Sequence, residues 1–276
     1  MPDAPIVHQR MRGAAMVSMQ SQEGKTKLSR LAQSGAAKAM LPRVHGGAPE
    51  IVFLNTAGGL TGGDRLSYHL EIGPNARVVA TTQAAERAYS SLEGTAPAEL
   101  DVNICVSENA ELAWLPQETI VFEAASLTRK TKIDLASTAR CLTCETIVLG
   151  RAAMGETLSK LRFRDVRSVH RDGAPVMIEP LMLNDGDLRH AKDPARFGPA
   201  RAIASVILVA ADAETRLEPL RRLLDSVAYG VEAAASAWDG RLVMRALAGD
   251  AFPLRRTVSA VLEYLSGAAL PRVWQM

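Results

Sequence analysis

Apolar and polar residues alternate along much of the middle of the chain, and this alternation predicts β-strands. Residues 100–106 and 130–135 place an apolar side chain at nearly every second position, the period of a strand with one buried face. Longer apolar runs at residues 139–149 and 202–209 are further strand candidates. Residues 231–246 alternate around an Asp-Gly pair, which is typical of a hairpin. The chain is therefore predicted to be mainly β.

Three segments in the middle share one pattern: an apolar residue, small or turn-forming residues, an alanine and then a strand. The alanines are Ala76, Ala110 and Ala139, roughly 30 residues apart. Quasi-repeats of this length indicate stacked β-layers, in which each coil buries its apolar face against its neighbours. A plain β-meander would give similar units, so both architectures remain open.

Two segments near the C-terminus have the period of amphipathic α-helices. Thr215 and Glu218 form a capping-box pattern before the first helix, and Gly230 stands where its C-terminal cap is expected. Pro253 suits the first turn of the second helix, which Gly267 closes. The apolar stripe of each helix predicts packing on the core, with binding to a partner's groove as the alternative.

Composition excludes several classes of protein. The 276 residues carry 32 basic and 30 acidic side chains, and a net charge of +2 is too weak to drive binding to nucleic acid. No apolar run approaches the ~20 residues of a membrane span. Three cysteines without a secretory signal indicate reduced thiols in the cytoplasm. We expect one domain over residues 1–276, with a flexible N-terminal stretch of roughly 25 residues that lacks periodicity.

A glycine-rich segment is the strongest local signal. Gly58, Gly59, Gly62 and Gly63 lie within six residues and are followed by Asp64. Their spacing fits neither a phosphate-binding P-loop nor a dinucleotide fingerprint. We therefore predict a glycine turn between strands, with at least one positive φ or a close backbone contact. Capping of that turn is the simplest role for Asp64.

No catalytic or metal motif stands out. Cys141 and Cys144 are three residues apart on a predicted strand, so their thiols should point to opposite faces and not share a metal. No G-x-S-x-G nucleophile elbow or H-E-x-x-H zinc motif occurs. This favours a binding or assembly protein. A β-rich hydrolase or isomerase with a site assembled in space, and a pure protein-binding scaffold, remain alternatives.

Several blocks in a fixed order give the chain a family resemblance. The blocks are LAQSGAAKAMLPR at 31–43, FLNTAGGLTGGD at 53–64, TTQAAERAY at 81–89, WLPQETIVFEAA at 114–125 and GRAAMGE at 150–156. With these blocks the chain resembles the UreD (UreH) family of urease accessory proteins over most of its length, although residues 11–23 and 185–200 carry no clear signature.

The resemblance implies a cytoplasmic chaperone without enzymatic activity of its own. Such a protein binds apo-urease together with UreF and the GTPase UreG, and assists GTP-dependent insertion of nickel into the urease active site. It implies stacked layers similar to a β-helix and allows a homodimer within the accessory complex. No cofactor would be tightly bound, because nickel is in transit.

Two acidic residues in matching motifs, Asp64 and Glu179, are expected to contribute to a weak nickel conduit. A site that transfers a metal must release it, so carboxylates, carbonyls and water suit it better than a closed set of His and Cys ligands. Glu179 precedes a proline and is expected to be partly buried at a strand end. Its alternative role is a structural ion pair with Arg167 or Arg171.

Overall fold

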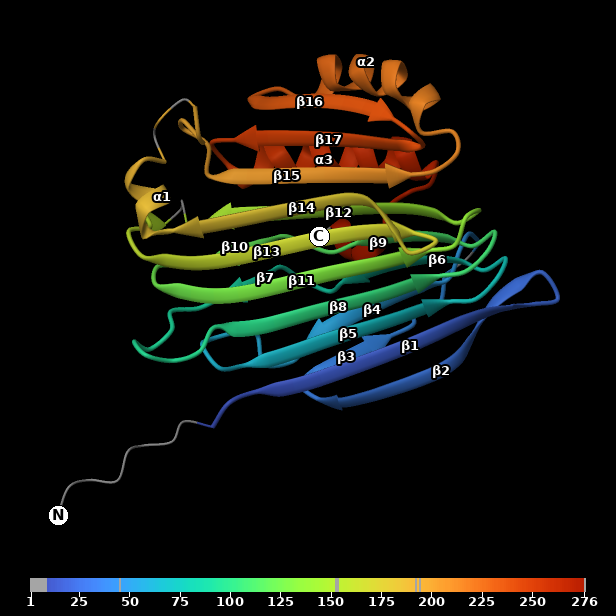
Figure 1. Cartoon of the computed structure of the whole chain (residues 1–276), viewed down its shortest axis with the longest axis horizontal. Helices are drawn as coiled ribbons and strands as arrows, with labels where there is room; N and C mark the ends of the chain where they lie inside the picture. Colours follow the sequence, from blue (N-terminus) through green and yellow to red (C-terminus); the bar gives the residue numbers. More distant parts are fainter. Residues whose placement is uncertain (1–8, 45, 152–153, 192, 194, 276) are drawn as a thin grey trace.

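The computed structural model describes residues 9–44, 46–151, 154–191, 193 and 195–275, which form two stacked β-sheets and a helical layer (Figure 1). The prediction of a mainly β protein with two helices near the C-terminus is confirmed. Within the described residues, no helix is both long and apolar enough to cross a bilayer.

The first sheet has seven strands. They are β1 (Arg12–Gln22), β2 (Lys25–Gly35), β5 (Arg65–Ile72), β8 (Ala98–Val106), β11 (Ala125–Leu135), β13 (Leu161–Arg171) and β14 (Ala174–Asn184). Their spatial order is β14-β13-β11-β8-β5-β1-β2, so β14 and β2 are the edges.

The second sheet has ten strands. They are β3 (Ala37–Met40), β4 (Glu50–Asn55), β6 (Arg77–Thr82), β7 (Glu86–Ala88), β9 (Glu111–Leu115), β10 (Thr119–Val121), β12 (Arg140–Leu149), β15 (Ala202–Val209), β16 (Val231–Trp238) and β17 (Arg241–Ala248). The main order is β16-β17-β15-β12-β9-β6-β4-β3, and β10 pairs with β12 and β7.

Successive central strands alternate between the two sheets, and each runs parallel to the preceding strand of its own sheet. The repeated alanines therefore stack. The backbone N–H of Glu111 donates to the carbonyl of Ala76, and that of Arg140 donates to the carbonyl of Ala110, both at 2.9 Å. Ala139, just before Arg140, takes the equivalent place in the third segment. The quasi-repeat thus marks three coils that lie one upon another.

Both ends of the molecule depart from this parallel stacking. β1 pairs antiparallel with β2, β13 with β14, and β15 with both β12 and β17. The resemblance to a β-helix is therefore not confirmed. Residues 12–22, part of the stretch expected to be flexible, form β1, which pairs with β2 and β5 although the segment lacks clear periodicity. Residues 1–8 lie outside the described residues.

Two apolar cores hold the layers together. One fills the space between the sheets, where Phe53 packs on Tyr68 and Trp114 with ring centroids 4.7 and 5.8 Å apart. The other lies between the ten-stranded sheet and the helices α2 (Leu217–Val227) and α3 (Ala251–Ser266). A short helix, α1 (Asp185–Arg189), follows β14. The prediction that both C-terminal helices pack their apolar stripes on the core is thus confirmed.

The helix ends were predicted unequally well. Gly267 closes α3 with a φ of 68°, as expected. The capping box at Thr215 is wrong, because residues 214–216 form a 3-10 turn and α2 begins only at Leu217. The Thr215 hydroxyl donates to the carbonyl of Asp212 at 2.7 Å instead. At α3 the cap is Asp250, which accepts the Phe252 N–H at 2.7 Å.

Candidate functional site

Three loops interrupt the ten-stranded sheet and stack on one another. We call them, together with Asn55 at the end of β4, the seam; it consists of residues 55–59, 83–85 and 116–118. Backbone hydrogen bonds fix their register. The Gln83 N–H donates to the carbonyl of Phe53 at 2.8 Å, and the Glu86 N–H donates to that of Glu118 at 2.9 Å. The strand pairing of the ten-stranded sheet is therefore interrupted at the same position in consecutive coils, and polar side chains from these coils meet there.

The blocks that carry the family resemblance converge on the seam. Those at 53–64, 81–89 and 114–125 all run through it. The block at 150–156 starts beside the third, because the Gly150 N–H donates to the carbonyl of Val121 at 2.8 Å. Residues 152–153 of that block lie outside the described residues. Segments far apart in the sequence thus build a single place in the structure.

The glycine turn is needed for close stacking at the seam. Gly58, Gly59 and Gly63 have φ values of 78°, 156° and 87°, which confirms the prediction of positive φ. A Cβ on Gly59 would lie 2.3 Å from a ring carbon of Tyr89, so no other residue fits there without displacement. A Cβ on Gly62 would meet a hydroxyl oxygen at 2.5 Å.

Asp64 caps this turn. Its Oδ1 accepts the Met11 N–H at 2.8 Å, and its Oδ2 accepts the Thr61 N–H at 2.9 Å. The side chain is buried, and both carboxylate oxygens are engaged by backbone donors. The geometry matches the simple capping interpretation of Asp64.

The outer side of the seam is covered by α3 and the residues after it. The Arg255 guanidinium donates to Gln117 Oε1 at 2.6 Å, to Glu118 Oε2 at 2.7 Å and to the carbonyl of Trp274 at 3.1 Å. The Trp274 indole N–H in turn donates to the carbonyl of Leu115 at 3.1 Å. The seam is therefore closed on its outer face and polar on its inner face.

A small cavity of about 30 Å³ lies behind the seam, between the sheets. A space of this size suits one water-sized guest. Its polar lining residues are Tyr68, Thr82, Glu86, Gln117, Thr119, Arg129, Thr131 and Glu145. Burial raises the pKa of Glu86 to about 7, although its carboxylate accepts hydrogen bonds from the Asn55 amide at 3.1 and 3.3 Å.

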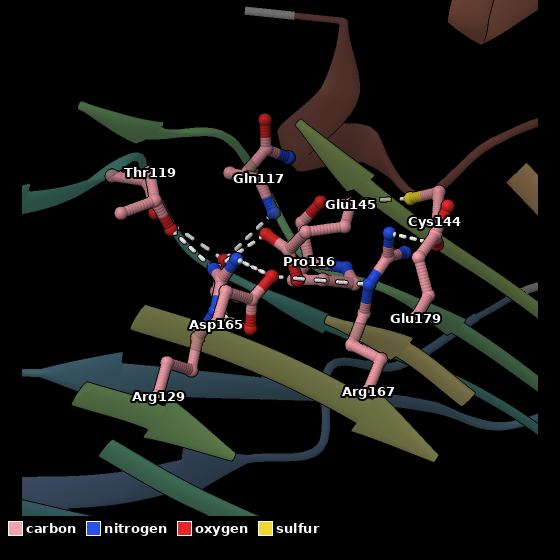
Figure 2. A network of polar contacts seen from close by, with 11 residues as sticks. Pro116, Gln117, Thr119, Arg129, Cys144, Glu145, Asp165, Arg167 and Glu179 are labelled. Carbon is pink, nitrogen blue, oxygen red and sulfur yellow. Dashed lines mark hydrogen bonds and ion pairs between the residues drawn. The ribbon is translucent and has the colours of Figure 1, made fainter. Parts of the chain in front are cut away.

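A buried ion-pair network continues inward from the cavity (Figure 2). Arg129 donates to both oxygens of Asp165, at 2.9 and 2.8 Å, and to Thr119 Oγ1 at 2.6 Å and Glu145 Oε1 at 2.5 Å. Burial would lower the pKa of Arg129, but the two carboxylates outweigh it and raise the pKa. Burial raises the pKa of Glu145 against the opposing effect of Arg129. The guanidinium is thus fully charged and held from three elements.

Glu179 lies at the far end of the network. Its carboxylate pairs with Arg167, accepts the Ser205 hydroxyl at 2.9 Å and pairs with Arg245 Nε at 2.8 Å. Burial would raise the pKa of Glu179, but Arg167 and Arg245 lower it. The residue sits in the middle of β14 and not at a strand end, so that detail of the prediction is wrong. The ion pair of Glu179 with Arg167 is the structural role given above as the alternative to a conduit. Arg171 forms no ion pair with Glu179; its guanidinium donates to the carbonyl of Ala139 at 3.1 Å.

Beside Glu179, a groove of about 630 Å³ opens between β14 and the strands β15, β16 and β17. The ten-stranded sheet extends past the edge of the seven-stranded sheet here, which leaves part of its inner face uncovered (Figure 1). Arg167 and Glu179 line the groove, and Glu145 lines both the groove and the internal cavity. A continuous set of polar residues therefore runs from the seam to the open groove, which we call the polar path.

The structure does not bring the two predicted conduit residues together. Asp64 directly precedes β5, and Glu179 belongs to β14, four strands away in the same sheet. At about 4.8 Å per strand this is a separation of roughly 20 Å. Glu179 lies on the polar path, and Asp64 lies off it.

The cysteines follow the prediction. Cys141 is buried in the core between the sheets and Cys144 in the core beneath the helices, so their thiols lie on opposite faces of β12. Burial raises the pKa of Cys141 to about 12 and that of Cys144 well above its usual range. Neither is a thiolate ligand near neutral pH. Among the described residues, no three His, Cys, Asp or Glu side chains gather closely enough to hold a metal ion.

Sequence reasoning missed Glu86, Arg129, Glu145 and Asp165. A signal for Arg129 was present, because it shares the two-residue period of the inward-facing side chains at 131, 133 and 135 on β11. A charged residue at an inward position of a strand requires a buried partner.

Comparison with known proteins shows the family. The profile described as UreD urease accessory protein matches residues 11–275. Urease accessory protein UreD of Cereibacter sphaeroides (strain ATCC 17025 / ATH 2.4.3) is 55% identical over 267 residues, covering 97% of this chain and 96% of the relative. The protein of that name from Paracoccus denitrificans (strain Pd 1222) is 50% identical over 273 residues, covering 99% and 95%. The chain belongs to the UreD family of urease accessory proteins.

Proposed function

We propose that this chain is a urease maturation chaperone that binds apo-urease with UreF and UreG and assists GTP-dependent nickel insertion in the cytoplasm. Membership of the urease accessory family supports a role in urease maturation. Within this proposal the chain is not an enzyme and holds nickel only in transit. A homodimer within the accessory complex is compatible with it.

The observation that supports a conduit is the polar path through an otherwise apolar sandwich. Charges of opposite sign alternate along its inner part, in the order Glu145, Arg129, Asp165, Arg167, Glu179 and Arg245. This alternation compensates the arginines, so a passing cation would not meet uncompensated positive charge. Glu86 adds an acidic group whose carboxylate accepts hydrogen bonds from the neutral Asn55 amide and forms no ion pair among the described residues.

Weak binding is what such a path requires. Carboxylates that are already hydrogen-bonded or paired hold a divalent cation less tightly than free ones, which permits both entry and release. We propose that nickel passes through the cavity behind the seam, at Glu86 and Glu145, to the groove at Glu179. Asp64 would contribute indirectly, by holding the glycine turn against the seam.

The test measures nickel per urease active site after assembly with UreF, UreG and apo-urease. The variants are Glu86→Gln, Glu179→Ala and Asp64→Ala, and the exposed Glu99→Ala is the control. Each variant is first shown to form the complete complex. Lost loading with an intact complex in Glu86→Gln or Glu179→Ala would support the conduit, and the control should load fully.

Full loading in all variants would refute the conduit and favour a scaffold that never handles the metal. Failure of the wild-type chain to bind apo-urease or UreF would refute the chaperone role itself. If only Asp64→Ala lost nickel loading, nickel would not pass along the polar path at Glu86 and Glu179.

A further inference from the structure

The outer face of the seven-stranded sheet carries an exposed apolar and basic area along its β14 edge. The side chains at even positions of β14 point outward, and Ile178 and Met182 are 57% and 63% exposed. Those at odd positions point inward, as the buried Met177 and Leu183 show. The inner face of β14 thus lines the groove with Glu179 and Leu181, and the outer face meets solvent, with Ile178 and Pro180 also bordering the groove at this edge.

Strand register places basic side chains next to these apolar ones. Arg164 pairs with Met182 and Arg162 with Asn184 across β13 and β14. Lys130, one strand further in on β11, lies in the row of Pro180. We call this surface the β14 face; its members are Lys130, Arg162, Arg164, Ile178, Pro180 and Met182.

In the part of the chain that the structure describes, no ion pair neutralises the cations of the β14 face, although Lys130 lies opposite Asp101 in the register of β11 and β8. Among the residues that the structure describes, Lys130, Arg162 and Arg164 form no ion pair, whereas the neighbouring Lys132 pairs with Asp134 at 2.7 Å. Three unpaired cations beside two large exposed apolar side chains are complementary to a protein surface with acidic groups around apolar ones. A nucleic acid would use the cations but gain little from Ile178 and Met182.

The position of the β14 face adds a second argument. β14 is the strand that separates this face from the groove, and Glu179 projects from it into the groove. A protein docked on the β14 face would therefore sit at the open end of the polar path. The seam end of the path, by contrast, is covered by Arg255 and Trp274.

We propose that the β14 face docks an acidic protein surface, which under the proposed function belongs to apo-urease, the acceptor of the metal. Ile178 and Met182 would supply the apolar contacts, and Arg162 and Arg164 the ion pairs. This inference rests on the proposed function and specifies which surface faces the acceptor.

The experiment measures the affinity of the full chain for purified apo-urease by biolayer interferometry at low and high salt. The test variant is Arg162→Glu with Arg164→Glu. The control is Lys25→Glu with Lys27→Glu, which makes the same charge change on β2 at the opposite edge of the sheet. All four positions are exposed, so neither variant should change the thermal midpoint. Met182→Asp tests the apolar contact separately.

We expect affinity for apo-urease to fall about tenfold or more in the double variant, most strongly at low salt, and to stay within about twofold in the control. Met182→Asp should also weaken binding. Equal affinity of wild type, test and control would overturn the inference and leave the proposed function intact.

Two other outcomes also overturn the docking of the acceptor here. In one, the double variant loses binding to UreF and keeps apo-urease; in the other, it loses only binding to a short DNA duplex. A wild-type chain that binds neither apo-urease nor UreF would refute the proposed function together with this inference.

Discussion

Replacing Glu86 with glutamine should flatten the dependence of stability on pH. Burial raises the pKa of Glu86 from its ordinary 4.5 to about 7. A tenfold change in proton affinity is worth about 1.4 kcal/mol, so this shift corresponds to about 3 kcal/mol. Because the folded carboxyl holds its proton more tightly than the unfolded one, its contribution to stability is fully present below about pH 4.5. That contribution is lost as the pH rises through about 7.

Glutamine retains the acceptor oxygen for the Asn55 amide but has no proton to lose. The variant should therefore match the wild type near pH 4.5 and exceed its free energy of unfolding by up to about 3 kcal/mol near pH 8. Glu145 is present in both proteins, so its own titration contributes equally to both curves.

The assay is urea denaturation followed by tryptophan fluorescence, at intervals between about pH 5 and about pH 8. Glu99→Gln is the control, because it makes the same carboxyl-to-amide change at a half-exposed surface side chain that pairs with Arg65. Wild-type and Glu86→Gln curves that stay parallel over this range would show that Glu86 titrates normally, and the argument from burial would fail.

Three further changes test other parts of the structure. Arg129→Met leaves the buried Glu145 without its ion-pair partner and leaves Asp165 with only the more distant Arg167, so it should cost about 3–5 kcal/mol in urea denaturation. Gly59→Ala forces a Cβ into an aromatic ring and should cost about 1–3 kcal/mol. Gly94→Ala, which meets no atom within 4 Å, should cost only about 1 kcal/mol, so equal losses would contradict the steric argument. A Cys141→Ala, Cys144→Ala double variant should load urease with nickel normally; reduced loading by a folded variant would contradict this.

Sequence pattern alone predicts the central strands of the seven-stranded sheet well, because strands such as β5 and β8 have one buried face and a two-residue period. Residues 100–106 fall within β8 as predicted, and the Asp239-Gly240 turn joins β16 and β17. The three alanine-marked segments were recognisable in the sequence, but their pattern left stacked coils and a plain β-meander open. Helix ends were less predictable, because a 3-10 turn replaces the capping box before α2.

The polar path was not predictable, because its members meet only through tertiary pairing. Arg129 finds Asp165 on a neighbouring strand of its own sheet and Glu145 on the opposite sheet. A strand pattern shows which face a side chain takes but not what lies across the core from it. Glu179 was found through the family resemblance, and its two arginine partners come from different sheets.

The alternation of strands between the two sheets also governs how the chain folds. Each central strand pairs with one that follows roughly thirty residues later, so no layer closes until the next coil has been formed. The conformational entropy of each loop is lost before the strand pairing that it permits can stabilise the chain. Proteins with non-local parallel pairing of this kind therefore fold slowly. Until then every finished coil exposes an open edge, which attracts other unfolded chains. We therefore expect recombinant yield to depend on the rate at which successive coils close, so slower synthesis at lower temperature should raise the yield more than a gain in final stability would.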